Sequence, residues 1–243
     1  MTRYQSNAQL KTLAKDRLTN HYRTAVTVFF LAWLIQFVSS ETAERLVPST
    51  TVPGTALFLC LSFAVSVAAG VLDAGISCFF LHLACGRPCS LTALFYGFRE
   101  QADKALSLSF VSGSLRLVCF TPWRLVFRQY LLSRAPGFLW LTLACLAAGL
   151  FVYVPFSLMF SQSFYLMLDF PGCGAVQILK MSARIMKGHK KRLLCLEAGF
   201  LPLMLLGFLS LGFGFLWLLP YRQMARTFFF LDVMAPDRPD SHV

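Results

Sequence analysis

The chain has 243 residues, of which 57% are hydrophobic and 14% are charged, and its mean hydropathy is +0.63. A soluble domain carries about a quarter charged residues, so this chain lacks the polar surface needed to cover a water-soluble globule. Its net charge of +11 would suit a nucleic-acid partner, but the basic residues stand in short segments between apolar runs, as membrane topology requires. The composition therefore predicts an integral membrane protein in contact with the lipid bilayer and argues against nucleic-acid binding.

Five apolar runs approach or exceed the length of about 20 residues that a helix needs to cross a bilayer. They are Thr24–Ser40, Thr55–Cys85, Ala105–Thr121, Phe138–Phe170 and Leu193–Met234. The last run is long enough for two crossings, with Gly212 and Gly214 as natural turn points. The sequence therefore predicts an all-α polytopic transmembrane helical bundle of about six spans. We expect one domain over residues 1–243, with amphipathic juxtamembrane helices on the cytoplasmic side.

The charges of the loops indicate the orientation. In the six-span arrangement the inner segments carry 15 Lys or Arg residues and the outer segments carry four, and cytoplasmic loops are the ones enriched in these residues. We therefore expect a multi-pass protein of the cell (inner) membrane with both termini in the cytoplasm. Arg116 falls inside a proposed span, where a charge is costly. A second arrangement thus stays open, in which residues 105–134 lie along the membrane surface.

A weak internal repeat, with a spacing of about 80 residues, divides the chain into units 7–85, 89–170 and 175–234. Each unit begins with a polar, helix-prone segment that leads directly into an apolar run. Three copies of a surface helix followed by a transmembrane hairpin would account for six spans. Chance similarity between apolar sequences is the alternative explanation.

Ionisable side chains inside the apolar runs are candidate functional groups, because a charge at membrane depth often marks an ion or proton pathway. Asp73 leads this set, and the cations that could complete an intramembrane polar site with it are Arg116, Arg222 and Arg226. The structural alternative places Asp73 near the inner interface, where a carboxylate costs little. Glu197 follows Lys190, Lys191 and Arg192 at the start of a proposed span, where stabilisation by these cations and by the helix N-terminus would explain it.

Small residues form a stripe along the second apolar run. Ser62, Ser66, Gly70 and Ala74 follow one another at intervals of four residues, so they share one face of a helix. Such a face lets another helix approach closely. The stripe predicts packing inside the bundle, and a seam between two copies of the chain is the alternative.

The segment Ala175–Lys191 has the clearest amphipathic pattern in the chain. Its apolar face is predicted to contain Val176, Leu179, Ala183 and Met186, and its cationic face contains Lys180, Arg184, Lys187 and Lys191. A helix of this kind lies on the inner leaflet, where anionic lipid headgroups attract each cation by about 1 kcal/mol. It would serve as a topology anchor or as a lipid sensor.

No catalytic motif occurs in the sequence: there is no nucleophile elbow, no zinc-protease helix and no phosphate-binding glycine loop. The eight Cys residues include no CxxC pair, and the spacing of His82, Cys85 and Cys89 fits no standard zinc site. We therefore expect no enzyme activity, no cofactor and no metal ion.

The C-terminal third resembles a known family. The residues that carry the resemblance are Ser182, Met186-Lys187-Gly188-His189-Lys190, Leu193-Leu194, Pro220-Tyr221 and Phe228–Phe230. They are similar to the domain-of-unknown-function family 975 of bacterial polytopic membrane proteins. The start, at Leu13-Ala14 and Asn20-His21-Tyr22, is also similar. The chain departs from the family pattern at Ala198–Pro202, where the family tends to have Trp. The resemblance implies a bacterial inner-membrane helical protein and no established activity.

Two functions of different kinds follow from these observations. The leading hypothesis is a non-catalytic membrane scaffold or accessory component that acts through helix packing and lipid contact, with a membrane protein partner or as a homo-oligomer. The alternative is a transporter or channel for ions or small solutes that uses the intramembrane Asp73.

Overall fold

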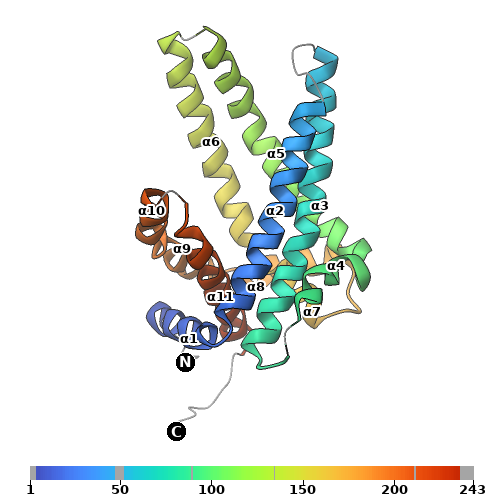
Figure 1. Ribbon diagram of the computed structural model, residues 1–243, viewed down its shortest axis with the longest axis vertical. Helices are drawn as coiled ribbons and strands as arrows, with labels where there is room; N and C mark the ends of the chain where they lie inside the picture. The colour runs from blue at the N-terminus through green and yellow to red at the C-terminus, as the bar shows by residue number, and fades with distance from the viewer. Residues whose placement is uncertain (1–3, 47–51, 89, 134, 211, 236–243) are drawn as a thin grey trace.

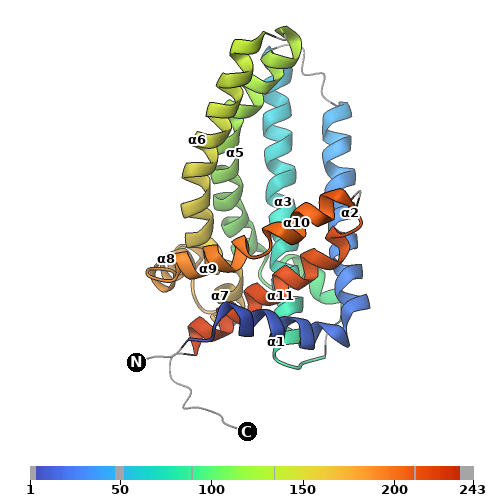
Figure 2. The same ribbon diagram turned by 90° about the vertical axis from the view of Figure 1, so that its left-hand side faces the viewer.

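The computed structural model describes residues 4–46, 52–88, 90–133, 135–210 and 212–235, and these residues form helices without a strand. Four long helices run along the long axis of the molecule (Figures 1 and 2): α2 (Tyr22–Leu46), α3 (Val52–Ala84), α5 (Ala102–Ser133) and α6 (Pro136–Phe160). The shorter helices gather around one half of this bundle, which we call the base: α1 (Asn7–Thr19), α4 (Tyr96–Arg99), α7 (Ser163–Asp169), α8 (Ala175–Ile185), α9 (Lys190–Ala198), α10 (Leu201–Leu209) and α11 (Phe215–Met234), with the 3-10 helix η1 (Leu91–Phe95). Both ends of the chain lie at the base (Figure 1).

Five helical segments of the described chain are long and apolar enough to cross a membrane. They are Tyr22–Ser39, Cys60–Ala84, Ala102–Ser133, Gly137–Asp169 and Lys190–Leu209. The sixth crossing expected from the sequence would be α11, which is not among them because Arg222, Arg226 and Asp232 interrupt its apolar character. The helical membrane bundle predicted from composition is thus present, with one qualifying segment fewer than the six-span arrangement needs.

Residues 105–133 form an upright helix rather than a helix lying across the end of the bundle. α5 continues through Pro122, and the hydroxyl of Thr121 donates a hydrogen bond to the carbonyl of Leu117 at 2.6 Å. α5 forms an antiparallel hairpin with α6 (Figure 2). Gly149 of α6 sets the contact: a Cβ added there would lie 2.5 Å from the carbonyl oxygen of Cys119. Close backbone approach of this kind needs glycine.

The last apolar run forms a hairpin whose two arms lie obliquely across the base (Figure 2). Its first arm is divided into α9 and α10 by a break at Gly199 and Phe200. The chain then reverses at Gly212, whose φ of 91° is a left-handed conformation that glycine adopts without strain. The predicted turn is therefore in place, but the arms do not run parallel to the four long helices.

The base is held by a hydrophobic core between α1, α3, α9 and α11. Helix α1 begins with a capping box, in which the Ser6 hydroxyl accepts from the Gln9 backbone and the Gln9 side chain accepts from the Ser6 backbone. The side chains that α1 contributes to this core are Leu10, Ala14 and Leu18, and all three are fully buried. The same core contains Phe79, Phe80, Leu193, Leu196, Phe200 and Phe229. The base thus contains the best-buried part of the chain.

The three sequence units 7–85, 89–170 and 175–234 each contain a short helix followed by a helical hairpin. Helix α1 precedes α2 and α3, helix α4 precedes α5 and α6, and helix α8 precedes the hairpin of α9 to α11. The third hairpin is inclined to the other two (Figure 2). The common origin of the three units stays a prediction from the sequence.

Replacement of Gly75 tests the packing of α3 against η1. A Cβ at Gly75 would overlap the backbone of Leu94, which cannot move aside as a flexible side chain could. We expect Gly75→Ala to lower the free energy of unfolding by at least about 1–3 kcal/mol, measured by thermal unfolding in detergent. The matched control is Gly137→Ala on α6, where a Cβ meets nothing within 4 Å. Equal melting temperatures of the two variants would contradict this packing.

Candidate functional site

The clearest polar constellation is an ion cluster where α9, α11 and α3 meet, and we call it the base cluster. The Glu197 carboxylate accepts hydrogen bonds from the Nε atoms of both Arg222 and Arg226. The two arginines are four residues apart and thus share one face of α11. The side chain of Glu197 is 13% exposed, against 29% and 33% for Arg222 and Arg226. One carboxylate, largely shielded from solvent, therefore pairs with two partly exposed cations.

Asp73 of α3 lies near the base cluster. It is partly buried, and it lies within electrostatic range of Arg226 and of Arg116. The carboxylates of Asp73 and Glu197 carry two negative charges, and the guanidinium groups of Arg222 and Arg226 carry two positive charges. Asp73 is shared between Arg226 of this cluster and Arg116 of α5, because its carboxylate is within electrostatic range of both.

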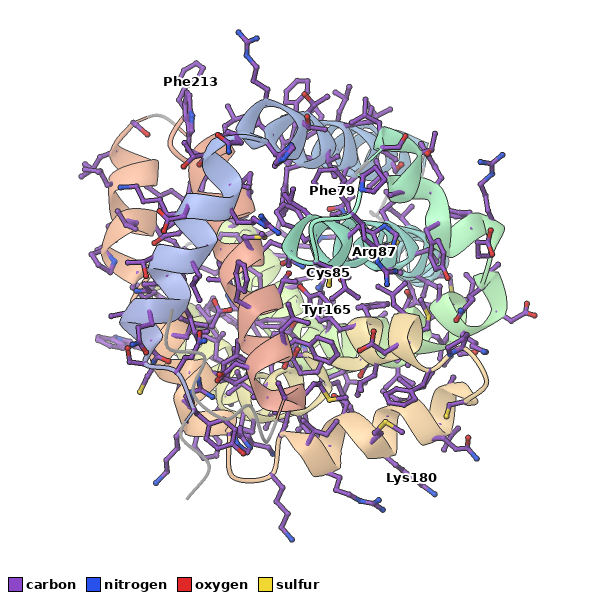
Figure 3. All side chains as sticks on the ribbon, turned by 90° about the horizontal axis from the view of Figure 1, so that it is seen from below. Phe79, Cys85, Arg87, Tyr165, Lys180 and Phe213 are labelled. Carbon is purple, nitrogen blue, oxygen red and sulfur yellow. The ribbon has the colours of Figure 1, made fainter. Side chains whose placement is uncertain are left out.

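A hydrogen-bonded aromatic group adjoins the base cluster on α11. The Tyr165 hydroxyl of α7 lies 2.9 Å from the Thr227 hydroxyl and accepts a hydrogen bond of 3.0 Å from the Gln223 side chain. The Tyr165 ring stacks on Phe230, with 5.1 Å between ring centres. Figure 3 shows Tyr165 in the middle of the molecule seen from below. These contacts join α7 to α11 and satisfy the buried hydroxyl groups.

A second ion pair ties the start of the chain to α11. Arg192 of α9 pairs with Asp232, and its guanidinium also donates to the Gln5 carbonyl at 2.6 Å. The Gln5 amide donates in turn to the Asp232 carboxylate at 3.2 Å. Farther along α1, Lys11 donates to the Gly199 carbonyl at 2.9 Å. The N-terminal helix is thus fastened over the hairpin of α9 to α11 by charged and polar contacts.

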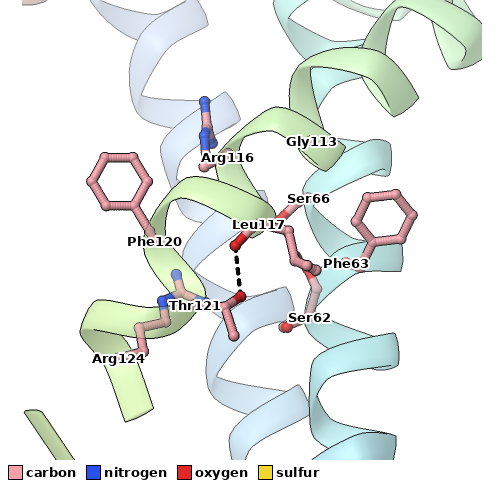
Figure 4. A pocket seen from close by; sticks show the side chains of 9 residues that line it. All are labelled: Ser62, Phe63, Ser66, Gly113, Arg116, Leu117, Phe120, Thr121 and Arg124. Carbon is pink, nitrogen blue, oxygen red and sulfur yellow. Dashed lines mark hydrogen bonds between the residues drawn. The ribbon is translucent and has the colours of Figure 1, made fainter. Parts of the chain in front are cut away.

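Arg116 lies apart from Arg222 and Arg226, but Asp73 is within electrostatic range of it. Arg222 and Arg226 meet at Glu197 with Asp73 nearby, whereas Arg116 lies on α5 beside a small cavity between α3 and α5 (Figure 4). This cavity has a volume of about 20 Å³ and is lined by Ser62, Phe63, Ser66, Gly113, Arg116, Leu117, Phe120, Thr121 and Arg124. Asp73 therefore lies between the cavity that Arg116 lines and the base cluster that contains Arg226.

Glu197 has a different setting from the one expected from the sequence. It lies in the last turn of α9 rather than near a helix N-terminus, and its partners come from α11 rather than from Lys190 to Arg192. Sequence reasoning missed this partnership, although a signal was present. The run from Leu193 to Met234 contains two acidic residues and two arginines, and an arginine in an apolar run needs an anionic partner.

The small-residue stripe of α3 faces other helices of the same chain. A Cβ on Gly70 would lie 2.6 Å from the Ser109 hydroxyl of α5, and Ala74 is fully buried beside Gly97 of α4. Ser62 and Ser66 line the cavity between α3 and α5 (Figure 4). All four residues of the stripe are therefore placed along contacts within one copy of the chain.

The predicted cationic face of Ala175–Lys191 points outward, but it does not belong to one helix, because α8 ends at Ile185, Lys187 lies in the turn after it and Lys191 lies in α9. Lys180, Arg184, Lys187 and Lys191 are all exposed, and Figure 3 shows Lys180 at the edge of the base. The buried face differs from the predicted one, because Ile178 and Ser182 are buried with Met186 while Val176 is 64% exposed. The cause is a specific contact: the Ser182 hydroxyl donates to the Met159 carbonyl of α6 at 2.8 Å, which turns this small polar residue inward.

A wider hollow opens at the base between α1, the end of α3 and α11. It has a volume of about 380 Å³ and is lined by Leu13, Asp16, Arg17, Asn20, His21, Ala84 and Phe228. Its polar residues come from the exposed side of α1 and from the turn that follows it. Among the residues that the structure describes, no group of three His, Cys, Asp or Glu side chains is arranged to hold a metal ion, and Cys89 of the dismissed zinc pattern lies outside them.

Comparison with known proteins identifies a family but no activity. The family model described as "Protein of unknown function (DUF975)" matches residues 1–237. No curated protein and no solved structure matches the chain. The matched range includes the four long helices and the whole of the base, so it covers both the base cluster and the cavity between α3 and α5.

Removal of the Glu197 charge tests the base cluster. We expect Glu197→Gln to destabilise the protein by about 2 kcal/mol, between the small effect of an exposed pair and the larger effect of a buried one. The two arginines would then lose the carboxylate to which both are bonded, and only Asp73 would remain within electrostatic range of Arg226. Thermal unfolding in nanodiscs measures the loss, and Glu197→Gln combined with Arg222→Gln should restore part of it. The control is Glu100→Gln, at an exposed acid at the end of α4. A loss of stability no larger than that of the control would show that the base cluster does not stabilise the protein.

Proposed function

Because the chain belongs to the DUF975 family of proteins of unknown function, as the residues of its C-terminal third predicted, we propose a role from its own structure. It is a non-catalytic component of the bacterial inner membrane, a scaffold or accessory subunit that works through helix packing and lipid contact. The observation that carries this proposal is the use of its charges: Glu197 of α9 pairs with both Arg222 and Arg226 of α11, and Asp73 of α3 lies within electrostatic range of Arg226.

In this proposal α2, α3, α5 and α6 cross the bilayer, and the base lies at the cytoplasmic side. The base holds both ends of the described chain and the exposed cations of α8 (Figures 1 and 3), which is the charge distribution of a cytoplasmic face. The hairpin of α9 to α11 lies partly immersed in the inner leaflet. Its tip residues Phe208 and Leu209 are 71% and 80% exposed, as an interfacial apolar segment requires.

The transporter alternative has weaker support than the scaffold. Its central residue, Asp73, faces arginines that are needed to neutralise it, and Arg226 is already bonded to Glu197. Separating the partners of such a network would leave uncompensated buried charges, whereas a proton or ion pathway needs groups that change partner or charge. The geometry of Asp73 is therefore explained by assembly of the base.

Helix α6 supplies a surface for a partner in the membrane. Among the described residues of α6, only Thr142 and Gly149 are buried, whereas most of residues 70–84 of α3 are buried. Its exposed side chains include Trp140 at 73% and Phe151 at 82%. Large aromatic side chains of this kind are frequent anchors at protein interfaces. An accessory subunit would present such a helix to another membrane protein.

Site-specific photo-crosslinking in native membranes tests the proposed role. We expect a photoreactive residue at Phe151 to form a discrete protein adduct of fixed stoichiometry, because a partner helix would cover this face. The matched control is the same residue at Trp33 of α2, which is 53% exposed and should crosslink to lipid. Lipid adducts alone at both positions, with a chain that purifies by itself, would count against the scaffold.

A further inference from the structure

A row of cations follows α8 and continues into α9. It consists of Lys180, Arg184, Lys187 and Lys191, which we call the cationic rim, and all four side chains are exposed. Between Asp169 and Glu197 the sequence has six Lys or Arg residues and no acidic residue. Among the described residues, only Arg192 of these six pairs with a carboxylate. The described part of the chain therefore leaves the charge of the cationic rim uncompensated.

The contact between α8 and α6 gives the depth of the cationic rim. The Ser182 hydroxyl donates to the Met159 carbonyl at 2.8 Å, so α8 packs against the inner end of α6. Residues 137–160 of α6 contain no charged side chain, and Gly149 lies at their middle. Met159 is ten residues beyond Gly149, or about 15 Å along the helix. Because the half-thickness of the hydrocarbon layer is also about 15 Å, the cationic rim lies at the level of the lipid headgroups.

The cationic rim faces sideways, toward the lipid that surrounds the protein. Seen from below along the long axis, α8 runs along the outer edge of the molecule and Lys180 points away from it (Figure 3). The opposite side of α8 carries Ile178 and Ser182, which are fully buried. Cations that point sideways at this depth reach the headgroups of the surrounding leaflet.

Exposed aliphatic side chains continue the cationic rim at both ends. Val176 precedes Lys180 by four residues and is 64% exposed, and Leu194 follows Lys191 by three residues and is 46% exposed. Residues three or four apart are neighbours on a helix surface, so each of these apolar side chains lies beside a cation. A phospholipid offers an anionic phosphate next to apolar chains, whereas a soluble polyanion matches only the charge.

We propose that the cationic rim binds the headgroups of anionic phospholipids in the cytoplasmic leaflet. Arg184 can hold a phosphate through paired hydrogen bonds, and the three lysines act as point charges. Each cation near an anionic leaflet strengthens binding by roughly fivefold. This inference rests on the proposed position of the base at the cytoplasmic side, and it names the lipid that the scaffold contacts.

The test measures which lipids the full chain and its variants retain. The chain is placed in nanodiscs of phosphatidylglycerol and phosphatidylcholine in equal amounts, and native mass spectrometry gives the ratio of the two lipids that stay bound after release. We expect Lys180→Gln with Arg184→Gln to lower this ratio at least fivefold, because half of the cationic rim is lost. Lys180→Arg with Arg184→Lys keeps both charges and should preserve the ratio. Equal melting temperatures in nanodiscs of phosphatidylcholine alone show that the variants are folded.

The matched control removes two cations that lie farther from the bilayer. Lys15→Gln with Arg17→Gln on the exposed side of α1 makes the same change in net charge, and α1 lies below α8 and α9 (Figure 2), so the ratio should stay unchanged. An unchanged ratio in the α8 variant, or an equal fall in the α1 control, would overturn the proposal. Binding of soluble polyglutamate by the cationic rim without a preference for phosphatidylglycerol would also overturn it. Adducts at Phe151 test the scaffold independently, so the two proposals can fail separately.

Discussion

The structure depends on neutralising the charges that α11 carries into an apolar protein. Arg222 and Arg226 stand on one face of this helix, and Glu197 of α9 bonds to both. Leaving a charge without a partner in a low-dielectric setting costs several kcal/mol. The chain therefore has to place α9 against α11, and the break at Gly199 with the turn at Gly212 lets it do so. The short inclined hairpin follows from this electrostatic requirement.

The hairpin in turn organises the base. Arg192 and Asp232 fasten the segment around Gln5, and Lys11 reaches the carbonyl exposed at the break near Gly199. Helix α1 can then bury Leu10, Ala14 and Leu18 in the main core. The four long helices rise from this support, and α6 keeps most of its apolar surface exposed. Charged contacts thus fix the base.

Much of the helical architecture could be predicted from the sequence, because apolar length and small-residue spacing are properties of single segments. The stripe from Ser62 to Ala74 and the turn near Gly212 are features of that kind. Pairing between segments was harder to predict. Periodicity identifies the residues that share a face of α11, but it does not reveal that Glu197 of another helix opposes them. The prediction of which side of α8 is buried was wrong for the same reason, since the hydrogen bond from Ser182 to Met159 is a tertiary contact.

The central claim is that the hairpin of α9 to α11 stays on the side of the membrane that holds the base, while α5 and α6 cross. The most direct measurement is labelling of single cysteines in intact cells by a membrane-impermeant maleimide, in a chain whose native cysteines are replaced. One cysteine stands at Phe213 in the turn of the hairpin, and the other at Ser133 at the far end of α5. If the hairpin stays on the side of the base, position 133 is labelled from outside and position 213 is not. Labelling of position 213 from outside would mean that the hairpin crosses the bilayer twice, and would contradict the account.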